Sequence, residues 1–274
     1  MKVKMHDKIE YIVADPTHNY TILVLSKVDI NKQPEVASTL MKLEKEVEQV
    51  GFISSDSPYD MTLRMAGGEF CGNATMSTAV YYTVSNGLEA IDVKIFILDI
   101  KKVVSVNVKL VDGIWTGVVD MPKPLSIKEI DIDDYKNIPI VEFDGISHII
   151  IEDKNKYKDL NLPDVDYKTN LQNHNAKLNA LIKSWCMKLN LKALGIMFYE
   201  ETTSRIIPVV YVKEVDTLFV ENSCASGTAA VGAYLAKKTN EPIERNFFEP
   251  GGSLKIIAEH DKKLLLCGSV KFLE

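Results

Sequence analysis

Two cysteines stand in matching places, each at the predicted start of a helix rich in small residues. Cys71 follows Ala66-Gly67-Gly68-Glu69-Phe70, and Cys224 follows Glu221-Asn222-Ser223. A helix N-terminus presents unpaired backbone N–H groups and a partial positive charge, and both stabilise a thiolate relative to a thiol. The sequence therefore predicts two thiols with lowered pKa values, although either cysteine alone would more often be inert core filling.

Two such thiols suit the inversion of a carbon atom that carries a carboxylate. If the two halves of the chain face each other across a cleft, one thiolate removes a proton from one face and the opposite thiol delivers a proton to the other. The backbone N–H groups at the helix starts would stabilise the enolate-like intermediate. This chemistry needs no pyridoxal-type cofactor, and the sequence carries no clear sign of a site for one. We therefore expect no cofactor.

The surroundings of the two cysteines repeat each other. Aligning the cysteines pairs Thr75 with Thr228 and Tyr81 with Tyr234. In both copies a strand-like run and a glutamate come first, and a small-residue helix follows. Because the half-chains around this match are of equal size, the sequence predicts an internal duplication.

The elements that position the cysteines read as an α/β (α+β) fold of two lobes. We expect lobes at residues 1–123 and 124–267, divided near Pro122 and Pro124. Residues 128–137 are acidic and polar, and 131–134 read as a solvated linker. Strand-like runs alternate along both halves, with Val104, Val106, Val108 and Leu110 on one face of a sheet. Helices are expected at residues 33–50 and 173–189, and each cysteine segment is expected to lead into a helix, one through Thr83 and the other through Ala236.

Composition excludes several other classes of protein. The 274 residues are 46% hydrophobic and 26% charged, with a net charge of −6, so a collagen-like or disordered chain is excluded. No basic stripe or long apolar run exists, so we expect neither nucleic acid nor a membrane as partner. Four cysteines without a disulfide pattern indicate a cytoplasmic location. Five histidines show no metal-ligand spacing, so no metal is expected. A homodimer is compatible with the sequence.

Three segments resemble the signature segments of the diaminopimelate epimerase fold family: Cys71-Gly72-Asn73-Ala74, Cys224-Ala225-Ser226-Gly227-Thr228 and Pro250-Gly251-Gly252-Ser253-Leu254. The resemblance covers essentially the whole chain. It is closer to the cofactor-independent histidine racemases of staphylopine-type metallophore synthesis, through Glu48-Gln49-Val50-Gly51-Phe52 and the two cysteine segments. The resemblance implies two pseudo-twofold-related lobes, each a sheet wrapped around a central helix that begins at a catalytic cysteine. It also implies that a last strand at about 268–274 returns to the first lobe.

The resemblance also implies a role for each matching residue. Cys71 and Cys224 fall on the acid–base pair, which would act on a small amino-acid substrate. The other matching residues would contact that substrate or flank the cysteines: Asn19, Glu48, Gln49, Gly72, Asn73, His148, Glu221, Ala225 and Ser226. Taken alone, His148 would be a satisfied sheet residue, Glu221 a solvated charge and Glu48 a carboxylate on a helix face.

Departures from the epimerase pattern bear on the substrate. Asn222 stands where the epimerase has an arginine, Ala193 stands in place of an asparagine, and the loop before Cys224 is short. In the epimerase, those groups hold the distal end of diaminopimelate. We therefore expect histidine rather than diaminopimelate as the substrate.

Three other functions stay open at this stage. The first is a diaminopimelate epimerase or another racemase of the same fold. The second is a thiol hydrolase that uses one cysteine with His148, which would form a covalent intermediate. The third is an amino-acid-binding protein without catalysis. Cys186 and Cys267 are expected to fill the core.

Overall fold

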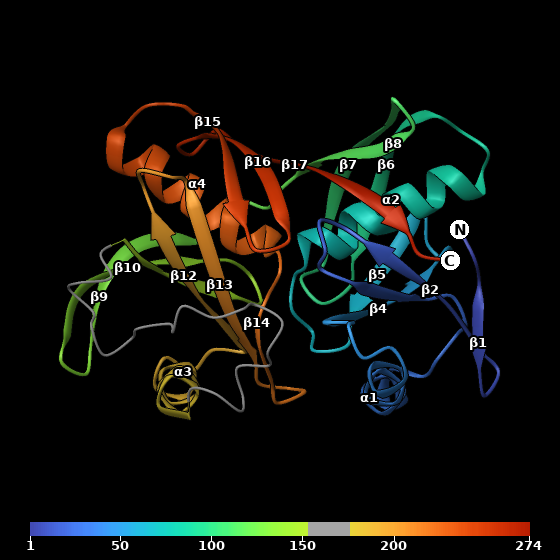
Figure 1. Ribbon diagram of the computed structural model, residues 1–274, viewed down its shortest axis with the longest axis horizontal. Coiled ribbons are helices and arrows are strands. Elements are labelled where there is room, and N and C mark those ends of the chain that lie inside the picture. The colour runs from blue at the N-terminus through green and yellow to red at the C-terminus, as the bar shows by residue number, and fades with distance from the viewer. Residues whose placement is uncertain (153–175) are drawn as a thin grey trace. The chain divides into compact units, whose positions relative to one another are not determined.

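A computed structural model of the protein describes residues 1–152 and 176–274 (Figure 1). The fold is α+β, and the chain divides into two compact units. Unit 1 comprises Met1–Met121 and Leu265–Glu274, and unit 2 comprises Pro122–Leu264. Within the described ranges, every helix is too short or too polar to cross a membrane.

Unit 1 contains two α-helices and a sheet to which the final strand of the chain also belongs. Its elements are β1 (Lys4–His6), β2 (Ile9–Asp15), β3 (Thr21–Val24), the 3-10 helix η1 (Ile30–Lys32), α1 (Gln33–Leu43), β4 (Gln49–Ser54), β5 (Met61–Met65), α2 (Gly72–Ser85), β6 (Ala90–Ile97), β7 (Lys102–Val111), β8 (Ile114–Asp120) and β17 (Lys263–Phe272).

The strands of unit 1 form a closed ring. Each strand from β2 to β8 pairs with the next along the chain, and β17 joins β8 back to β2. Helix α2 contacts the strands from β3 to β8, and Figure 1 shows these strands lying around it. Residues 72–80 of α2 are all buried, and most of them have small side chains, which lets the strands pack closely around the helix. The buried hydroxyls of Thr75, Thr78 and Thr83 donate to carbonyl oxygens one helical turn earlier, so these polar groups are satisfied inside the ring.

The alternation of side chains along a strand decides which residues of β4 face α2. Val50 and Phe52 belong to a buried cluster that includes Ala37 and Leu40 of α1. Because neighbouring residues of a strand point to opposite faces, Gln49 points to the face covered by α2. Its side chain consequently reaches the start of that helix.

Unit 2 has the same kind of plan. Its elements are β9 (Ser126–Ile132), β10 (Tyr135–Glu142), β11 (Ser147–Ile151), α3 (Ala176–Lys188), β12 (Ala193–Glu200), β13 (Arg205–Val212), β14 (Thr217–Val220), α4 (Ala225–Thr239), β15 (Ile243–Glu249) and β16 (Gly252–Glu259).

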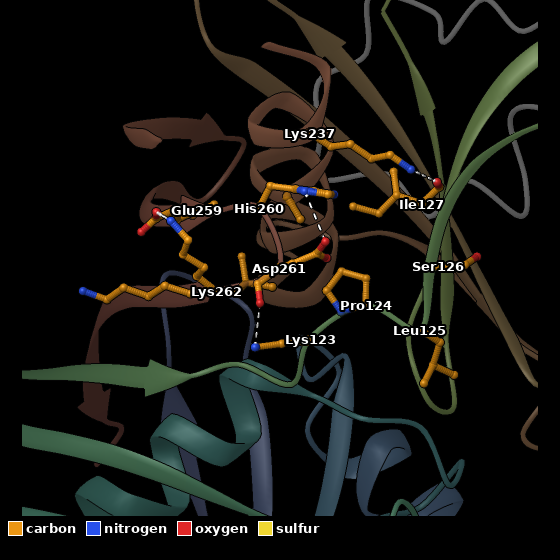
Figure 2. A pocket seen from close by; sticks show the side chains of 14 residues that line it. Lys123, Pro124, Leu125, Ser126, Ile127, Lys237, Glu259, His260, Asp261 and Lys262 are labelled. Carbon is orange, nitrogen blue, oxygen red and sulfur yellow. Dashed lines mark hydrogen bonds and ion pairs between the residues drawn. The ribbon is translucent and has the colours of Figure 1, made fainter. Parts of the chain in front are cut away.

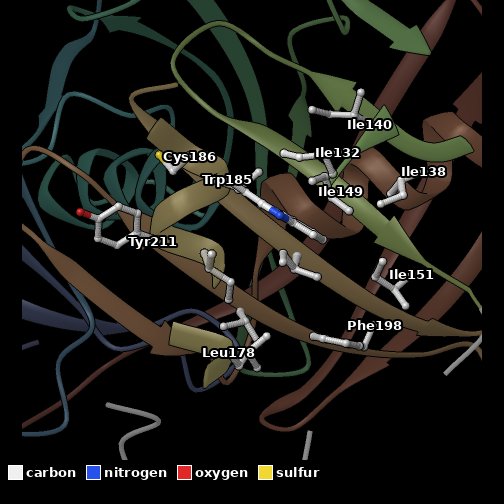
Figure 3. Close-up of a cluster of buried hydrophobic side chains, with 14 of the residues drawn as sticks. Ile132, Ile138, Ile140, Ile149, Ile151, Leu178, Trp185, Cys186, Phe198 and Tyr211 are labelled. Carbon is white, nitrogen blue, oxygen red and sulfur yellow. The ribbon is translucent and has the colours of Figure 1, made fainter. Parts of the chain in front are cut away.

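Two helices cover opposite faces of the unit 2 sheet. Strands β9 to β14 pair in chain order, β11 and β12 being parallel, and β15 joins β13 to β16. Helix α3 packs its Trp185 and Ile182 on residues such as Ile149 and Ile196 in one apolar cluster (Figure 3). His148 neighbours Ile149 on β11, so it points to the other face, which α4 covers.

Three details of secondary structure differ from the sequence-based expectation. The helix predicted at residues 33–50 ends at Leu43, because Val47 and Val50 fill the α1 cluster from a turn and a strand rather than from further helical turns. Glu48 therefore does not lie on a helix. Residues 131–134 form the end of β9 and the turn of the β9–β10 hairpin rather than a linker, although Asp131, Asp133 and Asp134 are exposed as expected. Asp133 in its turn accepts a hydrogen bond of 2.9 Å from Nε1 of Trp185.

Two smaller expectations also need comment. Leu110 is 36% exposed, although Val104, Val106 and Val108 of the same strand are buried as expected. The helix expected at 173–189 corresponds to α3, and the part of that expectation covering 173–175 lies outside the described residues.

Candidate active site

Cys71 is the N-cap residue of α2, directly before its first residue. Its backbone is extended, with φ −126° and ψ 112°, and its sulfur accepts a hydrogen bond from the backbone N–H of Ala74 at 3.3 Å. The Cys71 carbonyl accepts from both the N–H of Thr75, at 3.0 Å, and its hydroxyl, at 2.7 Å. An N–H directed at the sulfur stabilises negative charge there, so the local geometry favours proton transfer to and from this thiol.

Four polar residues surround the start of α2. The Cys71 thiol donates to Oε1 of Gln49 at 2.7 Å. Nδ2 of Asn73 donates to Oδ1 of Asn19 at 3.1 Å, and Nδ2 of Asn19 donates to Oε2 of Glu48 at 2.5 Å. Asn19 and Asn73 are almost fully buried. The predicted residues of unit 1 are therefore brought together, with Gly72 as the first residue of the helix.

Cys224 is the N-cap residue of α4 and has nearly the same backbone conformation, φ −122° and ψ 96°. Its carbonyl accepts from the N–H of Thr228 at 2.8 Å and from the Thr228 hydroxyl at 2.8 Å. These contacts repeat those between Cys71 and Thr75. The two cysteines thus occupy equivalent positions in their own units, as the alignment of the sequence predicts.

His148 and Ser226 lie beside Cys224. Nε2 of His148 is 2.9 Å from Oγ of Ser226, and that oxygen is 3.8 Å from the Cys224 sulfur. His148 is fully buried, and burial lowers its pKa to about 3. Gly195 leaves room for the ring, since a Cβ there would lie 2.3 Å from Nδ1 of His148. The imidazole is consequently neutral at physiological pH.

Electrostatics distinguish Cys224 from the thiolate expected at a helix start. Burial raises the pKa of Cys224 well above its usual value, and the carboxyl groups of Glu221 and Glu249 raise it further. The backbone N–H of Gly227 acts in the opposite direction but does not compensate. The expectation of a lowered pKa is therefore wrong for Cys224, which is a protonated thiol near neutral pH and is poised to donate a proton.

Two buried acids were not singled out from the sequence as candidate site residues. Glu249 ends β15 and accepts from the backbone N–H of Cys224 at 3.1 Å. Glu69 precedes Cys71 by two residues, and burial raises its pKa to about 7, an effect that Asp99 reinforces and Arg64 opposes. The position of Glu249 directly before the Pro250-Gly251-Gly252 signature is the one sequence signal that marks it.

The remaining predicted residues have these positions. Ala225 is the first residue of α4, and Glu221 follows β14 and is buried. Ala193 begins β12 and is fully buried, while the carbonyl of Asn222 accepts from the N–H of Gly251 at 2.7 Å. Cys186 fills the α3 core as expected, whereas Cys267 on β17 is only half-buried.

A separate pocket of about 380 Å³ lies in unit 2 (Figure 2). It is lined by residues 123–127, Ala233, Lys237 and residues 258–264, and none of the predicted site residues lines it. Lys123 donates to the carbonyl oxygen of Asp261 at 2.8 Å, and Lys237 donates to that of Ile127. Within residues 1–152 and 176–274, no group of three or more His, Cys, Asp or Glu residues is arranged to hold a metal ion.

Solved structures share this fold. A hydroxyproline epimerase from Agrobacterium vitis, with bound trans-4-hydroxy-L-proline, aligns with a TM-score of 0.65 at 9% identity, covering 98% of this chain and 92% of that chain. A predicted epimerase from Pseudomonas aeruginosa aligns with a TM-score of 0.67 at 11% identity, covering 96% of each chain. At these identities the likeness shows the fold, which this chain shares with both epimerases.

Sequence comparison gives the family. Residues 8–271 match the family described as Histidine racemase CntK N-terminal domain. A histidine racemase of Fusobacterium nucleatum subsp. nucleatum is 34% identical over 263 residues, which is 93% of this chain and 91% of that protein. A histidine racemase of Staphylococcus aureus is 29% identical over 272 residues, or 96% and 93% of the two chains. The chain therefore belongs to the histidine racemase family, and the resemblance seen in the sequence is confirmed.

Proposed function

We propose that this protein interconverts L- and D-histidine, with Cys71 and Cys224 exchanging the α-proton on opposite faces of the substrate. The observation that carries this proposal is the repeated cysteine turn. Each cysteine is the N-cap of a buried helix, and the hydroxyl of the threonine four residues later donates a hydrogen bond to the cysteine carbonyl. Membership of the histidine racemase family supports histidine as the substrate.

The proposed reaction pairs one thiolate with one thiol. In one direction Cys71 removes the α-proton as a thiolate while Cys224 delivers the proton of its thiol, and the reverse direction exchanges these roles. Charge moves onto the substrate carboxylate in the intermediate. The N–H groups of Gly72, Asn73, Ala225 and Ser226 are the donors that we assign to that carboxylate, because they belong to the first turns of α2 and α4.

The side-chain pocket is assigned from polar groups near the cysteines. Glu48 and Gln49 lie close to Cys71, where they bind Asn19 and the thiol respectively. Glu221 is buried beside Cys224. These residues offer hydrogen bonds to an imidazole, while Ala193 and Asn222 supply no cation for a distal carboxylate. A fixed polar group of a substrate can be discriminated by about 10⁴-fold, so diaminopimelate should be a poor substrate.

We further propose that the reaction needs no cofactor, that the enzyme is cytoplasmic and that D-histidine feeds the synthesis of a metallophore. The two thiols and the helix-start donors provide an acid, a base and charge stabilisation from the chain itself. All four cysteines are thiols rather than disulfides, as is usual in a reducing compartment. The proposed partner is the amino-acid substrate. We also propose a homodimer, and a measurement of the oligomeric state would test it.

A chiral assay over all common amino acids and LL-diaminopimelate, without added pyridoxal phosphate, tests the function. Histidine should have the highest kcat/KM, and exchange of its α-proton in heavy water should accompany racemisation. Faster turnover of diaminopimelate would overturn the substrate assignment. A trapped acyl-enzyme would favour a thiol hydrolase, and binding of histidine without proton exchange would favour an amino-acid-binding protein.

A further inference from the structure

The carboxyl group of Glu249 holds the turn on which Cys224 stands. Oε1 accepts from the backbone N–H of Cys224 at 3.1 Å, and Oε2 accepts from the hydroxyl of Ser223 at 2.9 Å. The hydroxyl of Thr228 lies 2.9 Å from Oε1. Glu249 is 6% exposed, so these contacts form away from bulk solvent. A single buried side chain thus binds residues on both sides of the cysteine.

The Thr228 hydroxyl makes this arrangement sensitive to one proton. Its oxygen is 2.9 Å from Oε1 of Glu249 and 2.8 Å from the carbonyl oxygen of Cys224, yet a hydroxyl has one proton to donate. When Glu249 is ionised, it competes with that carbonyl for the proton. When Glu249 is protonated, its own O–H donates to Thr228, and Thr228 donates to Cys224. In both protonation states of Glu249, its carboxyl group, the Thr228 hydroxyl and the Cys224 carbonyl have hydrogen-bond partners.

Unit 1 provides an internal comparison. The hydroxyl of Thr75 donates to the carbonyl of Cys71 at 2.7 Å, as in the second copy. In unit 2 the carboxyl group of Glu249 adds two contacts to this turn, one with the Thr228 hydroxyl and one with the backbone N–H of Cys224. The bond between the threonine hydroxyl and the cysteine carbonyl is therefore repeated in both units, and in unit 2 a buried acid takes part in the same turn.

We propose that Glu249 is a positioning residue for Cys224, and that its gain or loss of a proton controls how readily this thiol ionises. The proposal deepens the proposed racemase function and rests on it for its catalytic meaning. Glu249 acts through the turn and through its charge, and no contact with substrate is required of it.

The surrounding charges give the direction of the effect. Burial raises the pKa of Glu249 to about 8, and the charge of Glu221 makes a smaller contribution in the same direction. The hydrogen bonds from Cys224, Ser223 and Thr228 lower this pKa but do not outweigh burial. The titratable groups that act on it are Glu221 and Cys224, both from the turn before α4, while His148 of β11 is neutral and bonds Ser226. Below about pH 8 Glu249 is therefore mostly neutral. Above it, a new negative charge beside Cys224 raises the pKa of the thiol.

The test measures the reactivity of Cys224 directly. The full-length protein is treated with iodoacetamide from pH 6 to pH 10, and mass spectrometry of the Cys224 peptide gives its alkylation rate, which follows the thiolate fraction. The wild-type rate should rise with pH, flatten near pH 8 as Glu249 ionises, and then rise again. The variant Glu249→Gln should lack this break. It should match the wild type within about twofold at pH 6.5 and exceed it by about 3- to 10-fold at pH 9.

Two further variants complete the test. Glu244→Gln removes an exposed carboxylate of the same strand, which pairs with Lys255, and should keep the wild-type profile. Thr228→Val removes one donor to Glu249 and should move the break to higher pH. A wild-type profile without a break, a Glu249→Gln profile that superposes on it, or a Cys224 that reacts at no pH would each overturn the proposal. Because alkylation does not depend on turnover, failure to racemise histidine would count against the proposed function alone.

Discussion

Nε2 of His148 lies 2.9 Å from the hydroxyl oxygen of Ser226, and both groups are buried. With a pKa of about 3, His148 is too weak a base to keep a proton taken from the Cys224 thiol. The ring instead fixes the Ser226 hydroxyl, whose oxygen is 3.8 Å from the Cys224 sulfur. This relationship disfavours a thiol hydrolase in which His148 activates Cys224, and it makes Ser226 a link between the ring and the thiol.

Replacing Ser226 tests that link. Ser226→Ala should lower the free energy of unfolding by about 1–3 kcal/mol, because Nε2 of His148 is left buried without its partner. Racemisation should also slow, since the hydroxyl that lies 3.8 Å from the Cys224 sulfur is lost. Urea titration and a chiral assay measure the two effects. The exposed Ser105 of β7 supplies the control, and Ser105→Ala should stay within about 0.5 kcal/mol of the wild type. Equal stability of both variants would contradict the prediction.

The two cysteines should be separately essential. Cys71→Ser and Cys224→Ser should each abolish racemisation, because a serine hydroxyl is a far weaker acid than a thiol. Cys267 lies on β17 and is half-buried, so Cys267→Ser serves as the control and should keep most of the activity. If either of the first two variants kept more than about a tenth of the wild-type rate, a barrier change of only ~1.4 kcal/mol, the two-thiol mechanism would be excluded.

Gly195 should tolerate no side chain. A Cβ there would lie 2.3 Å from Nδ1 of His148 and 2.9 Å from Cε of Met197, so Gly195→Ala must displace the buried ring. We expect a loss of about 1–3 kcal/mol in the free energy of unfolding, together with lower activity. The double variant Gly195→Ala/His148→Ala removes the clash with the His148 ring and should lose less stability than the sum of the single changes. Additive losses in urea titrations would show that the contact with His148 is not the cause.

Glu69 should make stability depend on pH in a defined window. Its pKa is raised from 4.5 to about 7 by burial, so the folded state binds this proton more tightly than the unfolded state does. Its contribution is fully present below about pH 4.5 and is lost as the pH rises to about 7. The stability of the wild type relative to Glu69→Gln should therefore fall between pH 5 and pH 7, by at most about 1.4 kcal/mol per pH unit. A pH-independent difference in urea titrations would contradict this.

Local patterns in the sequence predicted the two cysteine turns, because a strand, a turn and a small-residue helix are each encoded by neighbouring residues. The end of α1 was mispredicted for a reason that lies outside the segment. Val47 and Val50 continue the apolar spacing of the helix, but the chain turns after Leu43. Val47 then reaches the same cluster from the segment before β4, and Val50 reaches it from β4 itself. Periodicity alone does not distinguish these arrangements.

The charge state of Cys224 was not predictable from its own segment. A helix start favours a thiolate, yet Glu249 approaches from β15 and adds its effect to that of burial. Such a contact depends on tertiary structure and has no local signature. The polar cluster of unit 1 was reached from the sequence only through family resemblance, because Asn19, Glu48 and Asn73 are separated by long stretches of chain.

The return of β17 to unit 1 also sets an order of events during synthesis. Residues 265–272 pair with β8 and β2, whereas the other strands of that ring precede Met121. A ribosome therefore completes the whole of unit 2 before it supplies the strand that closes unit 1. Unit 2 can fold as it emerges, while the nascent ring keeps strand edges on which other chains could assemble. The ring of strands around the helix that Cys71 caps is therefore encoded first but completed last.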